Sequence, residues 1–337
     1  KALKSIHFPS NSEELCAAQR TLKFEELFYM QMRLMNIKAK RNKEIPGQVF
    51  GAVGDHFNTF YKSHLPFQLT EAQKRVIKEI RKDTASGIQM NRLLQGDVGS
   101  GKTVVAVASL LNAVDAGWQG ALMAPTEILA RQHYATIKPL AEEIGVAVVL
   151  ITGRDKGKKR GDLVSCLRTG TTPIAIGTHA LFQEDIIFKD LALIVVDEQH
   201  RFGVHQRLAL REKGEAGGLT PHQLIMTATP IPRTLAMSAY ADLDVSVIDE
   251  LPPGRTPVKT VVVSDERRPE VVERIRNACS DGRQAYWVCT LIEESEVLQC
   301  QAAEVTRDEL TQALPELAVG LIHGRMKAAE KAEVMDA

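Results

Sequence analysis

A glycine-rich segment at residues 96–103 constrains the fold more than any other feature of the chain. Its letters, GDVGSGKT, fit the pattern GxxxxGK[ST] and stand between an apolar run at Leu93-Leu94 and a helical pattern from Val104. Glycines in this context let backbone N–H groups and the N-terminus of the next helix point at a phosphate. We therefore predict an ATP-binding loop formed by Gly96, Asp97, Val98, Gly99, Ser100, Gly101, Lys102 and Thr103. Lys102 would reach the β and γ phosphates, and the Thr103 hydroxyl would bind Mg²⁺.

Short aliphatic and β-branched runs on both sides of this loop predict an α/β fold. They are apolar on both faces, as buried parallel strands require, and helical patterns or loops separate them. The runs lie at 121–123, 147–151, 174–176, 191–196, 224–226 and 245–248. The sequence therefore predicts a parallel sheet covered by helices, the architecture of a P-loop NTPase.

Turn-forming residues divide the chain into three parts. Ser10 or Asn11 is placed to cap a helix that Pro46-Gly47 ends, so residues 1–50 are expected to form a helical linker. Three prolines and a glycine at 251–257 exclude both helix and central strand, which gives a first lobe at 51–253. A second lobe at 254–337, with strands expected at 258–263, 285–289 and 320–322, is short for a domain and is expected to be truncated.

An acidic pair follows the most apolar of these runs. Asp197 and Glu198 end the strand predicted at 191–196, which places two carboxylates at the sheet edge beside the phosphate loop. Asp197 suits a Mg²⁺ ligand, acting through a water molecule, and Glu198 suits a base that orients the attacking water. A turn cap is the alternative role. Thr227 and Thr229 end another strand, and their hydroxyls would bond across to the acidic motif.

Gln73 precedes a helical pattern and allows two interpretations. Thr70 and Gln73 have the spacing of a capping box, which starts a helix. A side-chain amide can also read the edge of an adenine ring, so we include Gln73 among the ATP-binding residues. The two roles are compatible.

Several polar segments are candidates for contacts with nucleic acid. Thr126, Thr178 and His179 follow strands and precede helices, where hydroxyl and N–H groups suit backbone phosphates. Arg154 belongs to a loop, 153–160, that holds five basic residues. This loop either tracks a phosphate backbone or is a solvated charge run. Lys+Arg and Asp+Glu are both 42, so any such surface is local rather than general.

Composition narrows the class of protein further. No apolar run approaches the roughly 18 residues of a transmembrane helix, so no membrane partner is expected. The five cysteines are scattered, which is typical of reduced thiols in a cytoplasmic protein. Nothing in the sequence points beyond a monomer.

Taken in order, these motifs resemble superfamily 2 DNA helicases and translocases. The resemblance runs essentially from end to end. The longer strings, among them DEQHRFGV at 197–204, ATPIPRTL at 228–235 and DELPPGRT at 249–256, are similar to bacterial members that remodel stalled replication forks and Holliday junctions. The resemblance implies two RecA-like lobes with ATP and Mg²⁺ between them. It also implies double-stranded and branched DNA as partners, and a role for His200, Thr227 and Thr229 in coupling the nucleotide state to movement.

The resemblance also implies parts that the chain lacks. A wedge domain that splits the fork would precede Lys1, and the late motifs with the arginine finger would follow Ala337. We therefore expect this chain to bind ATP–Mg²⁺ and to hydrolyse it slowly.

Other classes of protein remain open. An Mfd-like transcription–repair coupling translocase shares several of these strings. A DEAD-box RNA helicase fits less well, because His200 stands where that group has Asp. An ATP-binding docking module with little turnover is the alternative outside the motor proteins.

Overall fold

The chain forms two compact units, Lys1–Arg255 and Thr256–Ala337. The computed structural model describes residues 1–65, 67–155, 157–198, 214, 218–229, 243–250, 258–289, 296–324 and 326–336. Each unit is described by itself below.

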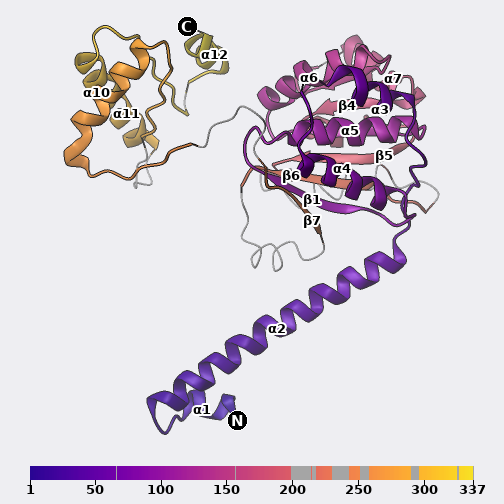
Figure 1. The fold of residues 1–337 in the computed structure, drawn as a ribbon, viewed down its shortest axis with the longest axis horizontal. Helices are drawn as coiled ribbons and strands as arrows, with labels where there is room; N and C mark the ends of the chain where they lie inside the picture. The colour runs from indigo at the N-terminus through magenta and orange to yellow at the C-terminus, as the bar shows by residue number, and fades with distance from the viewer. Residues whose placement is uncertain are drawn as a thin grey trace. The chain divides into compact units, whose positions relative to one another are not determined.

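A seven-stranded sheet, parallel throughout, forms the centre of the first unit (Figure 1). Its strands are β1 (Asn91–Gly96), β2 (Gln119–Met123), β3 (Val148–Ile151), β4 (Ile174–Gly177), β5 (Leu191–Asp197), β6 (His222–Thr227) and β7 (Asp244–Ile248). They lie side by side in the order β3-β4-β2-β5-β6-β1-β7. The predicted parallel sheet with flanking helices is confirmed.

Two helices, α1 (Ala2–His7) and α2 (Ser12–Glu44), precede the sheet, and α2 extends away from it (Figure 1). The elements that connect or cover the strands are α3 (Asp55–Thr59), α4 (Glu71–Thr84), α5 (Lys102–Asp115), α6 (Glu127–Glu142) and α7 (Gly157–Thr169), with a π-helical turn η1 (Phe60–His64) and a 3-10 turn η2 (His179–Phe182). Asn11 caps α2, because its Oδ1 accepts a hydrogen bond from the Glu14 N–H at 2.8 Å. No helix of the described residues is long and apolar enough to cross a membrane.

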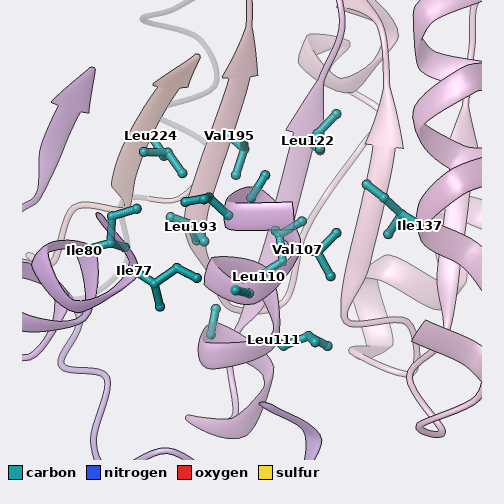
Figure 2. Close-up of a cluster of buried hydrophobic side chains, with 14 of the residues drawn as sticks. Ile77, Ile80, Val107, Leu110, Leu111, Leu122, Ile137, Leu193, Val195 and Leu224 are labelled. Carbon is teal, nitrogen blue, oxygen red and sulfur yellow. The ribbon is translucent and has the colours of Figure 1, made fainter. Parts of the chain in front are cut away.

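Strands β1 to β6 are buried on both faces, which explains why they read as continuous apolar runs, whereas Val245 and Val247 of the edge strand β7 are exposed. Alternate strand positions point to opposite faces. One face packs under α4, α5 and α6, and its cluster includes Leu94, Leu122, Leu193, Val195 and Leu224 (Figure 2). The other face packs against α7 and η2, and its cluster includes Leu93, Ala121, Ile194, Val196 and Ile225. Each fully buried aliphatic side chain contributes about 1.5–3 kcal/mol, so the strand ends that carry polar residues are held firmly.

The second unit differs from the prediction. Its described elements are the 3-10 turn η4 (Asp265–Arg267) and the helices α10 (Arg268–Ser280), α11 (Glu296–Ala313) and α12 (Ala328–Asp336). The segments 258–263, 285–289 and 320–322, all expected to be strands, have no strand structure. Val258, Val261 and Val262 have exposed side chains. A strand exists only when it pairs with a neighbour, so β-branched residues alone do not make one.

Candidate active site

The ends of three adjacent strands bring the predicted nucleotide-binding residues together. In the sheet, β6 lies between β5 and β1, and all three strands point the same way. Gly96 ends β1, Asp197 ends β5 and Thr227 ends β6. The sheet order jumps here, since β1 pairs with β6 and β7 rather than with β2. Ligands of parallel α/β sheets bind at such a position, outside the carboxyl ends of the strands.

The phosphate loop connects β1 to α5 with two glycines in the left-handed region. Gly99 has φ 75° and Gly101, the N-cap of α5, has φ 87°. The Lys102 ammonium donates hydrogen bonds to the carbonyl oxygens of Gly96 at 2.7 Å and Asp97 at 2.9 Å. The Lys102 side chain thus folds back onto the loop. To bind a phosphate, its ammonium group must give up the hydrogen bonds to these two carbonyls and donate to the anion.

The loop is also a tight cradle. A Cβ atom added to Gly96 would lie 2.5 Å from Ser100 Oγ, and one added to Gly101 would lie 2.3 Å from Gln73 Nε2. Ser100 Oγ is buried and has no hydrogen-bond partner among the described residues. An unpartnered buried hydroxyl inside a loop of this shape fits a site that receives a polar ligand.

Gln73 performs the capping role and holds the phosphate loop as well. Its Oε1 accepts from the Thr70 N–H while its own N–H donates to Thr70 Oγ1, which completes the capping box of α4. Its Nε2 donates to the Ser100 carbonyl at 2.8 Å. The side chain is 1% exposed, so reading an adenine edge would require it to leave these partners.

Asp197 is fixed by a residue that the sequence analysis did not select. His133, on α6, has its Nε2 2.8 Å from Asp197 Oδ2, and both side chains are 13% exposed. A signal was present in the sequence: Ala130, His133 and Ile137 follow helical spacing, and Ala130 and Ile137 are buried. Position 133 therefore belongs to the inward stripe of α6.

Glu198 has a left-handed backbone, with φ 51°, which is uncommon for a residue other than glycine. Its N–H donates to the Met226 carbonyl, and its Oε1 accepts from the Ala228 N–H at 3.0 Å. The acidic motif is thus joined to the end of β6 by a backbone N–H, where the sequence analysis expected threonine hydroxyls. Thr227 Oγ1 instead accepts from the Thr229 N–H at 3.2 Å.

The donors at this edge suit Mg²⁺. Thr103 lies in the first turn of α5, and Asp197 and Glu198 supply hard carboxylate oxygens, the ligand type Mg²⁺ prefers. No group of three or more His, Cys, Asp or Glu side chains in the described part of the chain could hold a metal by itself. Mg²⁺ commonly takes one or two protein ligands and completes its shell with phosphates and water. Burial lowers the pKa of Lys102, and the nearby carboxylates of Asp197, Glu198 and Asp97 oppose that shift.

The residues predicted to contact nucleic acid lie at the other half of the same sheet edge, at the ends of β3, β4 and β2. Thr126 is exposed and caps α6 by accepting from the Leu129 N–H. Arg154 follows β3 and pairs with Glu127 Oε2 at 3.1 Å. Thr178 is buried, and the neighbouring His179 is exposed. At this position His179 is therefore the more accessible side chain.

His200 lies outside the described residues.

Two further contacts that the sequence did not predict hold the segment after β7 against α4. Glu250 Oε2 accepts from the Ala72 N–H, and Arg75 donates to Asp249. The ion pair with Arg75 lowers the pKa of Asp249.

Comparison with known proteins agrees with this site. A family model described as DEAD/DEAH box helicase matches residues 70–238, half of the chain. The chain is 56% identical to the ATP-dependent DNA helicase RecG of Haemophilus influenzae over 323 residues, covering 94% of this chain and 46% of that protein. It is 52% identical to RecG of Escherichia coli K12 over 343 residues, covering 99% and 49%. The chain thus spans about half the length of the curated relatives it matches.

Solved structures give the same result. A structure of RecG bound to a three-way DNA junction matches 99% of this chain and 43% of its own, with a TM-score of 0.79 and 40% identity. The DEAD-box helicase Mss116 matches 85% of this chain and 62% of its own at a TM-score of 0.59 and 17% identity, which shows a shared fold alone. The resemblance to superfamily 2 helicases is confirmed. The family model matches half of its residues, and the loop after β1 and the acidic motif that ends β5 lie at one sheet edge with β6 between them, so the chain belongs to the DEAD/DEAH box helicase family.

Proposed function

We propose that the chain is the motor of an ATP-dependent DNA helicase that remodels branched DNA, such as stalled replication forks and Holliday junctions. It would couple ATP hydrolysis to translocation on double-stranded DNA. The relatives named ATP-dependent DNA helicase RecG and the RecG structure bound to a three-way junction support this choice of substrate.

One observation carries the proposal: the Glu198 carboxylate accepts a hydrogen bond from the Ala228 N–H, directly beside the phosphate loop. In this position Glu198 would orient the water that attacks the γ phosphate. Because Ala228 lies between Thr227 and Thr229, a movement of that loop would move the carboxylate. The proposed hydrolytic group would therefore respond to any movement of this loop.

The remaining parts of the site bind the nucleotide. The loop N–H groups and Lys102 would hold the phosphates, while the Thr103 hydroxyl and Asp197, the latter through water, would hold Mg²⁺. When bound, the ion neutralises charge on the phosphates. Lys102 would leave the carbonyls of Gly96 and Asp97 as the phosphates enter.

DNA would lie along the half of the sheet edge formed by β3, β4 and β2. Helix N-termini there present N–H groups, and Arg154 and His179 present side chains, which suits a phosphate backbone. We also propose that the protein is a cytoplasmic monomer. The bacterial relatives and the free thiols of Cys16, Cys166, Cys279 and Cys289 support the location.

The test is ATP hydrolysis by the protein with forked DNA, with linear duplex and without DNA, using Glu198→Gln as the blank. Stronger stimulation by forks than by linear duplex is the expected result. Equal stimulation would favour a general or Mfd-like translocase, and no stimulation would favour a docking module. Lys102→Ala should abolish nucleotide binding in a titration with a fluorescent ATP analogue. A titration that overlays the wild type would contradict the assignment of the phosphate loop.

A further inference from the structure

We infer that His133 is a positioning residue for the carboxylate of Asp197 and that, by this contact, helix α6 holds the proposed Mg²⁺ ligand in place. The inference rests on the proposed function, since it concerns how this chain prepares its own residues for Mg²⁺ and nucleotide. It adds a residue that neither the phosphate loop nor the acidic motif contains.

The hydrogen bond has a defined direction. An ionised carboxylate only accepts hydrogen bonds, so the proton lies on His133 Nε2 and is donated to Asp197 Oδ2 across 2.8 Å. A carboxylate has room for about four such bonds. His133 therefore fixes the rotation of the Asp197 carboxylate and leaves acceptor capacity for the water shell of a metal.

Burial makes this contact restrictive. Both side chains are 13% exposed, so water competes poorly for either group. His133 is held in turn by α6, whose neighbouring inward residues Ala130 and Ile137 are fully buried. The hydrogen bond therefore favours one orientation of the carboxylate before any ion arrives.

The contact also joins the two halves of the sheet edge. Asp197 ends β5 in the nucleotide half, whereas α6 follows β2 in the half proposed for DNA. The Thr126 cap lies seven residues before His133, two helical turns away on the same helix. His133 is thus the point at which this helix contacts the metal-binding side.

Residues that hydrogen-bond a metal ligand from outside usually contribute 10–100-fold to metal affinity. We therefore expect His133→Ala to raise the Mg²⁺ concentration needed for half-maximal nucleotide binding about tenfold. Affinity for the nucleotide in EDTA should stay within about twofold of wild type, because the phosphate loop is untouched. The readout is the fluorescence of an N-methylanthraniloyl-ATP titration at stepped Mg²⁺ concentrations.

Two further variants separate positioning from packing and keep the test valid if the alanine variant fails to fold. His133→Gln places an amide N–H near the position of Nε2 and should restore most of the Mg²⁺ dependence. His133→Asn is polar but too short to reach Oδ2, and it should behave as alanine does. Thr136→Ala, an exposed position on the same helix, is the matched control and should match wild type.

Three results are informative. Wild-type Mg²⁺ dependence in the alanine and asparagine variants would overturn the inference. An equal loss of affinity with Mg²⁺ and in EDTA would overturn it as well, since His133 would then support the fold in general. If wild type itself bound no nucleotide at any Mg²⁺ concentration, the proposed function would fail instead.

Discussion

Gly101 has two independent reasons to be glycine. Its φ of 87° is strained for any L side chain, and a Cβ there would lie 2.3 Å from Gln73 Nε2. Gly101→Ala should therefore displace Gln73 from the Ser100 carbonyl and cost roughly 1–3 kcal/mol, with a matching loss of nucleotide affinity.

Urea unfolding and a fluorescent nucleotide titration check this prediction. The matched control is Gly153→Ala, because a Cβ at Gly153 meets nothing within 4 Å. Equal nucleotide affinity of the two variants would show that the loop tolerates a side chain at position 101.

His222 gives the fold a dependence on pH. It is fully buried; its Nδ1 accepts from the Met90 N–H at 2.8 Å, so its Nε2 carries the proton that goes to the Gln48 carbonyl at 2.6 Å. Burial lowers the pKa of His222 from 6.5 to about 4. A second proton on Nδ1 would face the Met90 N–H, so the folded protein resists protonation.

The sign of the effect follows from linkage. Because the folded pKa is the lower one, the unfolded chain binds more protons between pH 6.5 and 4, and stability falls as the pH decreases through this window. We expect His222 to account for a loss of about 2 kcal/mol in the free energy of unfolding between pH 7 and pH 5.

Urea unfolding of wild type and His222→Gln at pH 7 and pH 5 measures this loss in the free energy of unfolding. The variant should be less stable at pH 7 and should lose less stability on acidification. Parallel pH dependences of the two proteins would contradict the assignment.

At the scale of elements, an ion pair connects α6 to the loop before α7. Glu127, the first residue of α6, pairs with Arg154 at 3.1 Å and with Arg131 at 2.8 Å. The carboxylate thus holds Arg154, which is 70% exposed, beside the N-terminus of α6. A basic residue held in this way is placed for one phosphate contact.

We therefore expect Arg154→Ala to weaken DNA binding without regard to sequence and to reduce the slope of log Kd against log salt by about 0.9. Fluorescence anisotropy of labelled duplex at several salt concentrations measures the slope. Arg168→Ala removes the same charge at the opposite end of α7 and serves as the control. An unchanged slope for Arg154→Ala, or an equal change in the control, would exclude a direct phosphate contact.

An apolar run in the sequence is not sufficient to predict a strand. The apolar runs of the first unit became strands because each has a neighbour to pair with and at least one face buried in the core. The run at 258–263 is also rich in valine, although it contains Lys259 and Thr260, and it is exposed and has no strand structure in the described second unit. Pairing is a property of two segments, so one segment cannot predict it.

At the scale of the whole molecule, the described contacts of the phosphate loop and acidic motif all lie within Lys1–Arg255. A protein of residues 1–255 should therefore bind Mg²⁺–ATP within about threefold of the full chain, a difference below 1 kcal/mol. The same nucleotide titration on both proteins provides the measurement, with Lys102→Ala in the shorter protein as the blank. A loss of a hundredfold would show that the second unit contributes a direct ligand.

The sequence by itself determined the family of this protein and pointed to the residues of the proposed nucleotide site. The phosphate loop and the acidic motif depend on residues close together in the chain, so their letters identify them. Tertiary structure decided how these groups are held: Asp197 by His133, the phosphate loop by Gln73, and Glu198 by a backbone N–H rather than a hydroxyl. These contacts join residues 27 to 64 positions apart, and only the order of the strands brings them together.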